Sequence, residues 1–179
     1  MYTDYKKTLK TFLVDDNVLT LKMQEDYLNS RFGRKLNIST FKTGEDCLGA
    51  ISASEPDLVV LDYNLDSQKS GAANGLEILK KIRKHHENVD VIMLSGQAKI
   101  DIAVETMRMG AKDYIEKGET SSFHLEQIVK GILTNAKQLH ELKSYKLGFW
   151  LAVSLLSVIT ISTLVLYFFF PEYTKHLPL

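Results

Sequence analysis

The chain has 179 residues, which is enough for one or two domains. Its 22 basic residues balance 22 acidic ones, so no basic excess points to a nucleic-acid partner. The single cysteine, Cys47, excludes an internal disulfide and fits a reducing compartment.

Short apolar runs alternate with helical patterns along the first 138 residues. The runs predict five strands, which end at Val14, Phe41, Asp62, Ser95 and Ile115. The stretches between them predict helices over 17–31, 44–54, 75–84 and 100–109, and a last helix that begins at about residue 122. This βα order, repeated five times, predicts an α/β fold with a doubly wound, five-stranded parallel sheet.

Polar residues stand at the ends of four predicted strands. Asp15 and Asp16 follow the first strand, Asp62 closes the third, Ser95 ends the fourth and Lys117 follows the fifth. In parallel sheets, ligands sit beyond these carboxyl ends. A carboxylate attacks an anionic phosphoryl group poorly because like charges repel, and a divalent cation removes that repulsion. The pattern therefore indicates aspartyl-phosphate chemistry with Mg²⁺, which prefers oxygen ligands.

With these residues in place, the chain resembles the receiver domain of two-component response regulators. The resemblance covers residues 8–138 and rests on segments 12–17 (FLVDDN), 61–63 (LDY), 75–79 (GLEIL), 93–96 (MLSG) and 110–117 (GAKDYIEK). It implies the flavodoxin-like (βα)5 receiver fold and a phosphoacceptor that is not an enzyme, although it has self-catalysed phosphotransfer and slow autodephosphorylation. The implied phosphodonor is a sensor histidine kinase or a phosphotransfer protein.

The resemblance also implies roles for the acidic residues. Asp62 is the expected phosphoacceptor, already ionised and in need of no base. Asp16 is expected to bind Mg²⁺ directly, and Asp15 at least partly through water. The backbone carbonyl of Asn64 and the carboxylate of Asp62 complete the expected set of metal ligands.

A second group of residues is expected to sense the phosphoryl group. Lys117 should pair with the acids and then with the phosphoryl group, while Ser95 should move toward its oxygens. Tyr114 would then swing inward and reshape the face made by the fourth helix, fifth strand and fifth helix. Gln97 and Asn64 are candidates for tuning dephosphorylation.

Two positions depart from the family pattern. The stretch 63–74 is about five residues longer than usual. It either restricts access to the site and contacts a partner, or it is a tolerated surface insertion. Gly118 replaces the usual proline after Lys117, and glycine does not favour a cis peptide.

Residues 147–170 contain no charge. At about 1.5 Å per residue, a helix of this length exceeds the ~30 Å hydrocarbon core of a membrane, and Phe149, Trp150 and Tyr167 lie near its ends. The alternative is a buried core helix. The predicted organisation is a receiver domain at 1–138, a juxtamembrane extension of the last helix at 139–146, a transmembrane helix at 147–170 and an extracytoplasmic tail at 171–179.

Basic residues predict the orientation of this span. Lys137, Lys143 and Lys146 precede it closely, whereas only Lys175 follows, which places the receiver domain in the cytoplasm. No long apolar segment suggests a cleaved signal peptide at the N-terminus. We therefore expect a single-pass, tail-anchored protein of the bacterial inner membrane.

No glycine or proline separates the last predicted helix from the apolar segment, so the two form either one continuous rod or two helices with a break near Ser144. Gly148 and Ala152 make a small-xxx-small pair, and a stripe before them predicts a parallel homodimer. That stripe comprises Leu125, Ile128, Ile132, Leu139 and Leu142. Its upstream part should instead pack on the receiver's own sheet.

The overall prediction is a membrane-anchored response regulator that signals by protein contact at the membrane, to a downstream protein that the sequence does not identify. One alternative is a phosphorelay intermediate or phosphate sink with no output of its own. Another is a phosphorylation-independent membrane scaffold, which the complete set of acids, serine and lysine disfavours.

Overall fold

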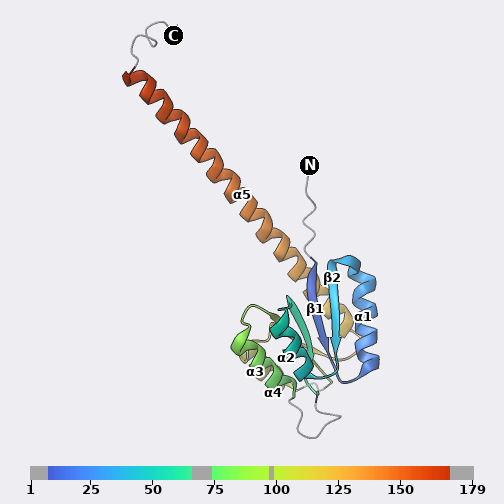
Figure 1. Ribbon diagram of the computed structural model, residues 1–179. Coiled ribbons are helices and arrows are strands. Elements are labelled where there is room, and N and C mark those ends of the chain that lie inside the picture. The colour runs from blue at the N-terminus through green and yellow to red at the C-terminus, as the bar shows by residue number, and fades with distance from the viewer. Residues whose placement is uncertain (1–7, 66–73, 97–98, 170–179) are drawn as a thin grey trace. The chain divides into compact units, whose positions relative to one another are not determined.

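The computed structural model describes the backbone of residues 8–65, 74–96 and 99–169, and the side chains of these residues except 136–145, 147 and 165–169 (Figure 1). The chain divides into two units, Met1–Leu133 and Thr134–Leu179. Residues 66–73 of the longer stretch 63–74, Gln97, the last residue of the predicted span and the predicted tail at 171–179 lie outside the described residues.

The first unit is built on a five-stranded parallel sheet in the order β2-β1-β3-β4-β5, which confirms the predicted fold (Figure 1). Its strands are β1 (Leu9–Val14), β2 (Leu36–Phe41), β3 (Leu58–Asp62), β4 (Asp90–Ser95) and β5 (Asp113–Glu116). Because the chain moves from β2 back across β1 to β3, the strand order reverses between β1 and β3. Ligands of such sheets bind at that reversal, beyond the carboxyl ends of the strands.

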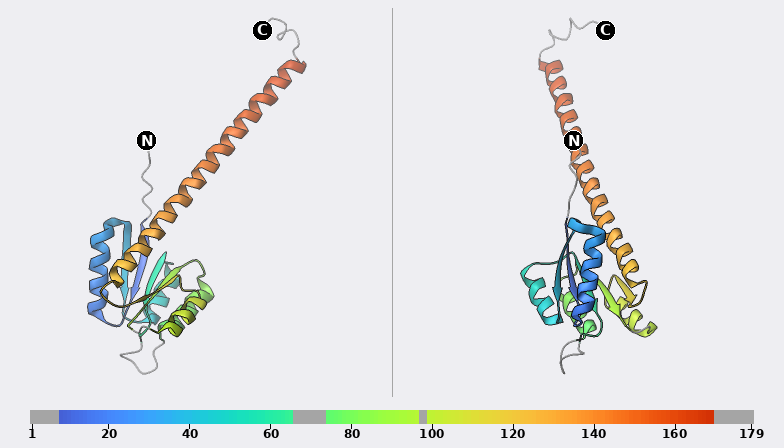
Figure 2. Two further views of the ribbon diagram at one scale, coloured as in Figure 1. Left: turned by 180° about the vertical axis from the view of Figure 1, so that it is seen from behind. Right: turned by 90° about the vertical axis from the view of Figure 1, so that its right-hand side faces the viewer.

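Helices cover both faces of the sheet, as the alternation of strands and helices predicts (Figure 2). They are α1 (Val18–Phe32), α2 (Gly44–Ala53), α3 (Gly75–His85), α4 (Ile100–Arg108) and α5 (Ser121–Phe169), with a short 3₁₀ turn, η1 (Gly33–Lys35), after α1. These bounds lie within about two residues of the predicted ones. Asn17 caps α1 by accepting from the backbone N–H of Leu19 at 2.9 Å, and Gly33 ends that helix at φ 52°.

The strands bury both faces, as continuous apolar runs in parallel sheets do. Alternate residues of β1 enter different cores, with Phe12 packed beneath α2 and α3 and Leu13 packed beneath α1 and α5. Neither core includes an apolar side chain from the described part of α4.

An ion cluster around the buried Glu126 joins α5 to α1. Glu126 is 1 % exposed, and its carboxylate accepts from Arg31 Nε at 2.8 Å, from Tyr27 Oη at 2.7 Å and from Lys130 Nζ at 2.6 Å. Hydrogen bonds from Arg31, Lys130 and Tyr27 lower the pKa of Glu126 to about 2. The carboxylate therefore remains charged in the folded protein well below the pH at which an unfolded chain would protonate it.

We expect Glu126→Gln to lower the melting temperature by several degrees at neutral pH, because the charged bonds to Arg31 and Lys130 are weakened. A lowered folded pKa stabilises the fold above the unfolded value of 4.5, and that contribution is lost as the pH falls toward about 2. Thermal melts across this range should thus show the variant and the parent converging in acid. Glu105→Gln, an exposed position on α4, is the control and should show little change.

Thr106 is fully buried on α4, and its hydroxyl has no hydrogen-bond partner among the described residues. A buried hydroxyl without a partner costs stability, so Thr106→Val, which keeps the shape, should stabilise the fold by about 1 kcal/mol. Chemical denaturation of both proteins measures the difference. The same change at Thr20 on α1 should give a smaller effect, and a destabilised Thr106→Val would show that the hydroxyl is satisfied.

The second unit is the C-terminal part of α5. The helix continues past Ser144 without a break, as predicted for a continuous rod. From Phe149 to Leu164 its large apolar side chains are exposed, with Trp150 67 % exposed. Among the residues described, no helix is long and apolar enough to cross a membrane. The predicted span at 147–170 lies partly outside those residues, and the structure does not support it.

Candidate functional site

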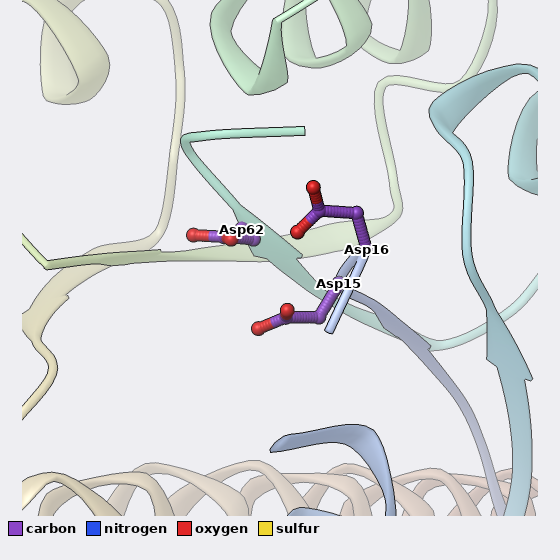
Figure 3. A group of neighbouring side chains, drawn as sticks. All are labelled: Asp15, Asp16 and Asp62. Carbon is purple, nitrogen blue, oxygen red and sulfur yellow. The ribbon is translucent and has the colours of Figure 1, made fainter. Parts of the chain in front are cut away.

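Three carboxylates meet at the reversal point of the sheet (Figure 3). Asp15 and Asp16 follow β1, and Asp62 is the last residue of β3. One carboxylate oxygen from each lies within 4.8 Å of the others, and Asp15 and Asp62 are only 1 % and 3 % exposed. The structure thus brings together the three acids that the sequence predicted.

Backbone interactions hold these acids in place. The N–H of Asp15 donates to the carbonyl of Phe41 at 3.1 Å, and Oδ1 of Asp15 accepts from the N–H of Asn17 at 2.9 Å. Because Asn17 also caps α1, the turn after β1 is fixed on both sides. The carboxylate of Asp15 is therefore directed by the start of the helix.

Gly75 is a part of the site that sequence reasoning treated only as a helix start. The N–H of Gly75 donates to the carbonyl of Tyr63 at 2.9 Å, and a Cβ at this position would collide with the backbone of Asp62 and Tyr63. Only glycine permits this approach. The signal in the sequence was the glycine of the GLEIL segment, but its proximity to Asp62 is a tertiary feature.

Lys117 bridges two of the acids. Its Nζ lies 2.7 Å from Oδ2 of Asp15 and 2.9 Å from Oδ2 of Asp62, and its backbone N–H donates to the carbonyl of Ser95 at 2.7 Å. No cis peptide occurs in the described chain, so the bond from Lys117 to Gly118 is trans. With this trans bond, the side chain of Lys117 still reaches both acids. Burial lowers the pKa of Lys117, but its bonds to Asp15 and Asp62 outweigh that effect and raise it overall. The ammonium group therefore stays charged.

Asp62 is more basic than an ordinary aspartate. Burial raises its pKa, and the bond to Lys117 only partly offsets this. Its Oδ1 atom is buried with no hydrogen-bond partner among the described groups. Three clustered acids offer only oxygen ligands, which a hard divalent cation prefers, so Asp15, Asp16 and Asp62 could hold Mg²⁺.

The remaining predicted residues surround this cluster. Ser95 is fully buried at the end of β4, and Tyr114 is half-buried on β5, where it packs against the core beneath α2 and α3. Asn64 is half-buried two residues after Asp62. Their roles in phosphoryl binding, switching and metal binding stay predictions. Gln97 falls outside the described residues, so its role also stays a prediction.

Comparison with known proteins agrees with this site. The model of the family "Response regulator receiver domain" matches residues 11–130, and the chain belongs to this family. Its members accept a phosphoryl group from histidine kinases and are phosphoacceptors, not enzymes in the ordinary sense. The acidic cluster is typical of the magnesium site of receiver domains.

Individual relatives share only the receiver part. The chain is 30 % identical over 105 residues to the luminescence regulatory protein LuxO of Vibrio campbellii, covering 59 % of this chain and 21 % of LuxO. It is 31 % identical over 111 residues to the transcriptional regulatory protein MalR of Bacillus subtilis, covering 61 % and 44 %. The receiver domain of NtrX from Brucella abortus aligns with a TM-score of 0.60 at 32 % identity, covering 69 % and 98 %. The matched part of the chain thus spans less than half the length of LuxO and of MalR.

Proposed function

We propose that this protein is a membrane-anchored response regulator that accepts a phosphoryl group on Asp62. The contact of Lys117 with both Asp15 and Asp62, inside a cluster of three acids, is the observation that carries the proposal. Two buried acids, the half-buried Asp16 and a single lysine leave an excess of negative charge, which a bound cation would offset.

The two oxygens of Asp62 have different tasks in the proposed step. Oδ2 is held by Lys117, whereas Oδ1 has no hydrogen-bond partner among the described residues and serves as the nucleophile. An Oδ1–P bond forms as the P–N bond of a phosphohistidine donor breaks, and the departing imidazole takes up a proton. Lys117 then neutralises part of the phosphoryl charge. Asp15, Asp16 and Asp62 would hold Mg²⁺, which would supply the remaining positive charge.

A protein donor fits the surface beside the acids. Val18, Leu19 and Met23, on the first two turns of α1, are 54 %, 69 % and 65 % exposed. They lie on the helix that begins two residues after Asp16, so this part of α1 starts beside the site. An exposed apolar patch of this kind marks a protein contact more often than a small-molecule site, which supports a histidine kinase or phosphotransfer protein as the donor.

Incubation of the purified protein with acetyl phosphate, or with a phosphohistidine protein, tests this function. With Mg²⁺ present we expect the mass of one phosphoryl group to be added, and after chelation of Mg²⁺ no addition. A protein that stays unmodified under both conditions, while it binds its partner at the membrane, would be the phosphorylation-independent scaffold instead. Modification without any downstream binding would indicate a phosphorelay intermediate or phosphate sink.

Membrane anchoring is supported by the character of the second unit. Its exposed apolar side chains have no cover within the described chain, and the hydroxyls of Ser154, Ser157, Thr160 and Thr163 each donate to a carbonyl three residues earlier. A helix whose polar groups are satisfied internally is one that lipid accepts. We place the receiver domain on the cytoplasmic side, because the lysines before residue 147 favour that side.

We expect residues 1–146 alone to stay in the soluble fraction and accept phosphate, while the full chain requires detergent. A reporter fused after Leu179 should report the far side of the membrane, and one fused before Met1 the cytoplasm. Alkaline carbonate extraction and protease protection are the measurements. Release of the full chain by carbonate would contradict the anchor, and a cytoplasmic C-terminal reporter would contradict its orientation.

Fewer residues are available to form the proposed homodimer than the sequence indicated. Leu125 and Ile132 are buried in the receiver's own core, 3 % and 8 % exposed, so they are not available for pairing. Leu139 and Leu142 lie outside the described side chains. Any parallel seam must therefore involve these two residues and the Gly148–Ala152 pair.

A further inference from the structure

The chain leaves the first unit at the edge of the sheet opposite the acids. Each strand ends on the side of the site, and each helix carries the chain back to the edge where the next strand begins (Figure 1). The start of α5 follows the same course: Ile132 and Leu133, the last residue of the first unit, pack in the core that includes Leu9 and Leu36, the first residues of β1 and β2. The second unit therefore continues from the edge at which the strands begin, which we call the amino edge.

Basic side chains gather at the amino edge. Arg31 lies in the last turn of α1, and the 3₁₀ turn η1, which leads into β2, supplies Arg34 and Lys35, both exposed. Lys130 of α5 lies beside Arg31, because its Nζ and Nη2 of Arg31 contact the same oxygen of Glu126, at 2.6 Å and 3.0 Å. The side chains of Arg31 and Lys130 are 51 % and 52 % exposed. We call Arg31, Arg34, Lys35 and Lys130 the basic surface.

This basic surface carries an excess of positive charge. Glu126 pairs with two of its members but is only 1 % exposed, so the carboxylate is turned inward while the cations reach solvent. Four cations against this carboxylate leave three positive charges. The neighbouring sequence adds no acid, since neither 27–44 nor 127–140 contains an aspartate or a glutamate. The surface is therefore suited to an anionic partner.

The length of the chain favours lipid as that partner. The thirteen residues 134–146 separate the first unit from the uncharged segment 147–170. As a helix they span about 20 Å. An anchor at 147–170 thus keeps the basic surface within about that distance of the lipid head groups, at a high effective concentration. The dipole of α1 gives a structural reason for Arg31 at its end, but Arg34 and Lys35 follow the helix.

We propose that the basic surface binds anionic lipid head groups, so that the amino edge lies on the membrane and the edge that carries Asp62 faces the cytoplasm. The inference rests on the proposed membrane anchor. A basic residue near an anionic bilayer typically raises the ratio of bound to free protein about fivefold, and salt screens this attraction. The contact would hold the phosphoacceptor on the side that a protein donor reaches.

Energy transfer to acceptor-labelled lipid tests this orientation in the full chain, in bilayer discs of phosphatidylcholine alone or mixed with phosphatidylglycerol. The donor dye is placed at Asn29→Cys or at Val18→Cys in a Cys47→Ala background. Both positions are exposed on α1, and they lie about 16 Å apart along the helix. We expect phosphatidylglycerol to increase transfer from position 29 more than from position 18, and high salt to reverse the increase.

The double variant Arg34→Gln, Lys35→Gln should lower the ratio of lipid-bound to free first unit about 25-fold, which removes the effect of phosphatidylglycerol. The matched control is Lys80→Gln, Lys81→Gln, an exposed adjacent pair on α3, which packs on the other face of the sheet. The control should behave like the parent. Equal transfer in both kinds of disc, a larger increase at position 18, or a response that survives the first double variant would overturn the proposal.

Failure of the anchor gives a different result. An anchored chain comigrates with discs of either composition, so a full chain that does not comigrate with phosphatidylcholine discs counts against the anchor. The basic surface is then judged by comigration with the phosphatidylglycerol discs alone. Comigration that is lost in high salt and in the Arg34→Gln, Lys35→Gln variant would support it, and absence of comigration in the parent would overturn it.

Discussion

Replacing Asp62 by asparagine is expected to abolish phosphorylation and to stabilise the fold. The phosphoryl signal from acetyl phosphate should fall to background, because an amide oxygen is not a nucleophile toward phosphorus. At neutral pH we also expect a gain of about 1 kcal/mol in the free energy of unfolding, since burial makes the charged form of Asp62 costly. Asp62 would then be a residue that the chemistry requires although its buried charge destabilises the fold.

The sign of the pH dependence separates this gain from a simple packing change. The folded pKa of Asp62 is raised above its ordinary value of 3.8, so the cost of ionisation is absent below 3.8 and grows as the pH rises through the folded pKa. Chemical denaturation should therefore show the Asp62→Asn gain at neutral pH and its disappearance in acid.

Asp16→Ala should instead weaken Mg²⁺ binding, measured by calorimetry. Undiminished phosphorylation of Asp62→Asn would overturn the assignment of the phosphoacceptor.

Replacing Lys117 by methionine is expected to have the largest effect on stability. Lys117 is the cation that contacts both Asp15 and Asp62, and its loss leaves two buried carboxylates close together. Removing one partner of a buried ionic group typically costs about 3 kcal/mol. We expect a loss of that size at neutral pH, together with slow or absent phosphorylation because the phosphoryl charge is no longer neutralised.

Two rescue conditions identify charge as the cause. Added Mg²⁺ should restore much of the stability of Lys117→Met, because the cation replaces the lost charge. Lowering the pH should also restore it, since protonated acids no longer repel each other. Lys112→Met is the matched control: its Nζ pairs with Asp90 at 2.7 Å on the surface, so the cost should be below about 1 kcal/mol. A Lys117→Met protein as stable as the parent would mean that the acids are not coupled through this lysine.

Local pattern was sufficient to predict the fold and the membership of the site. Short runs rich in β-branched and apolar residues, separated by helical periodicity, predicted the five strands, and parallel order brings the carboxyl ends of those strands to one edge. Asp15, Asp16, Asp62 and Lys117 were therefore predicted to converge, and the structure clusters the three acids and pairs Lys117 with Asp15 and Asp62. Turn chemistry likewise placed the start of α1 at Asn17.

Tertiary packing decided what the pattern could not. The sequence does not show that Gly75 must lie against the backbone of Asp62, that Glu126 gathers Tyr27 and Arg31 from a distant helix, or that Arg83 fastens the turn at Gly110. Each of these depends on which elements become neighbours, and neighbours far apart in the chain leave no periodic signal. Burial has the same origin: the chain supplies the carboxyl of Asp62, but only the folded environment raises its pKa.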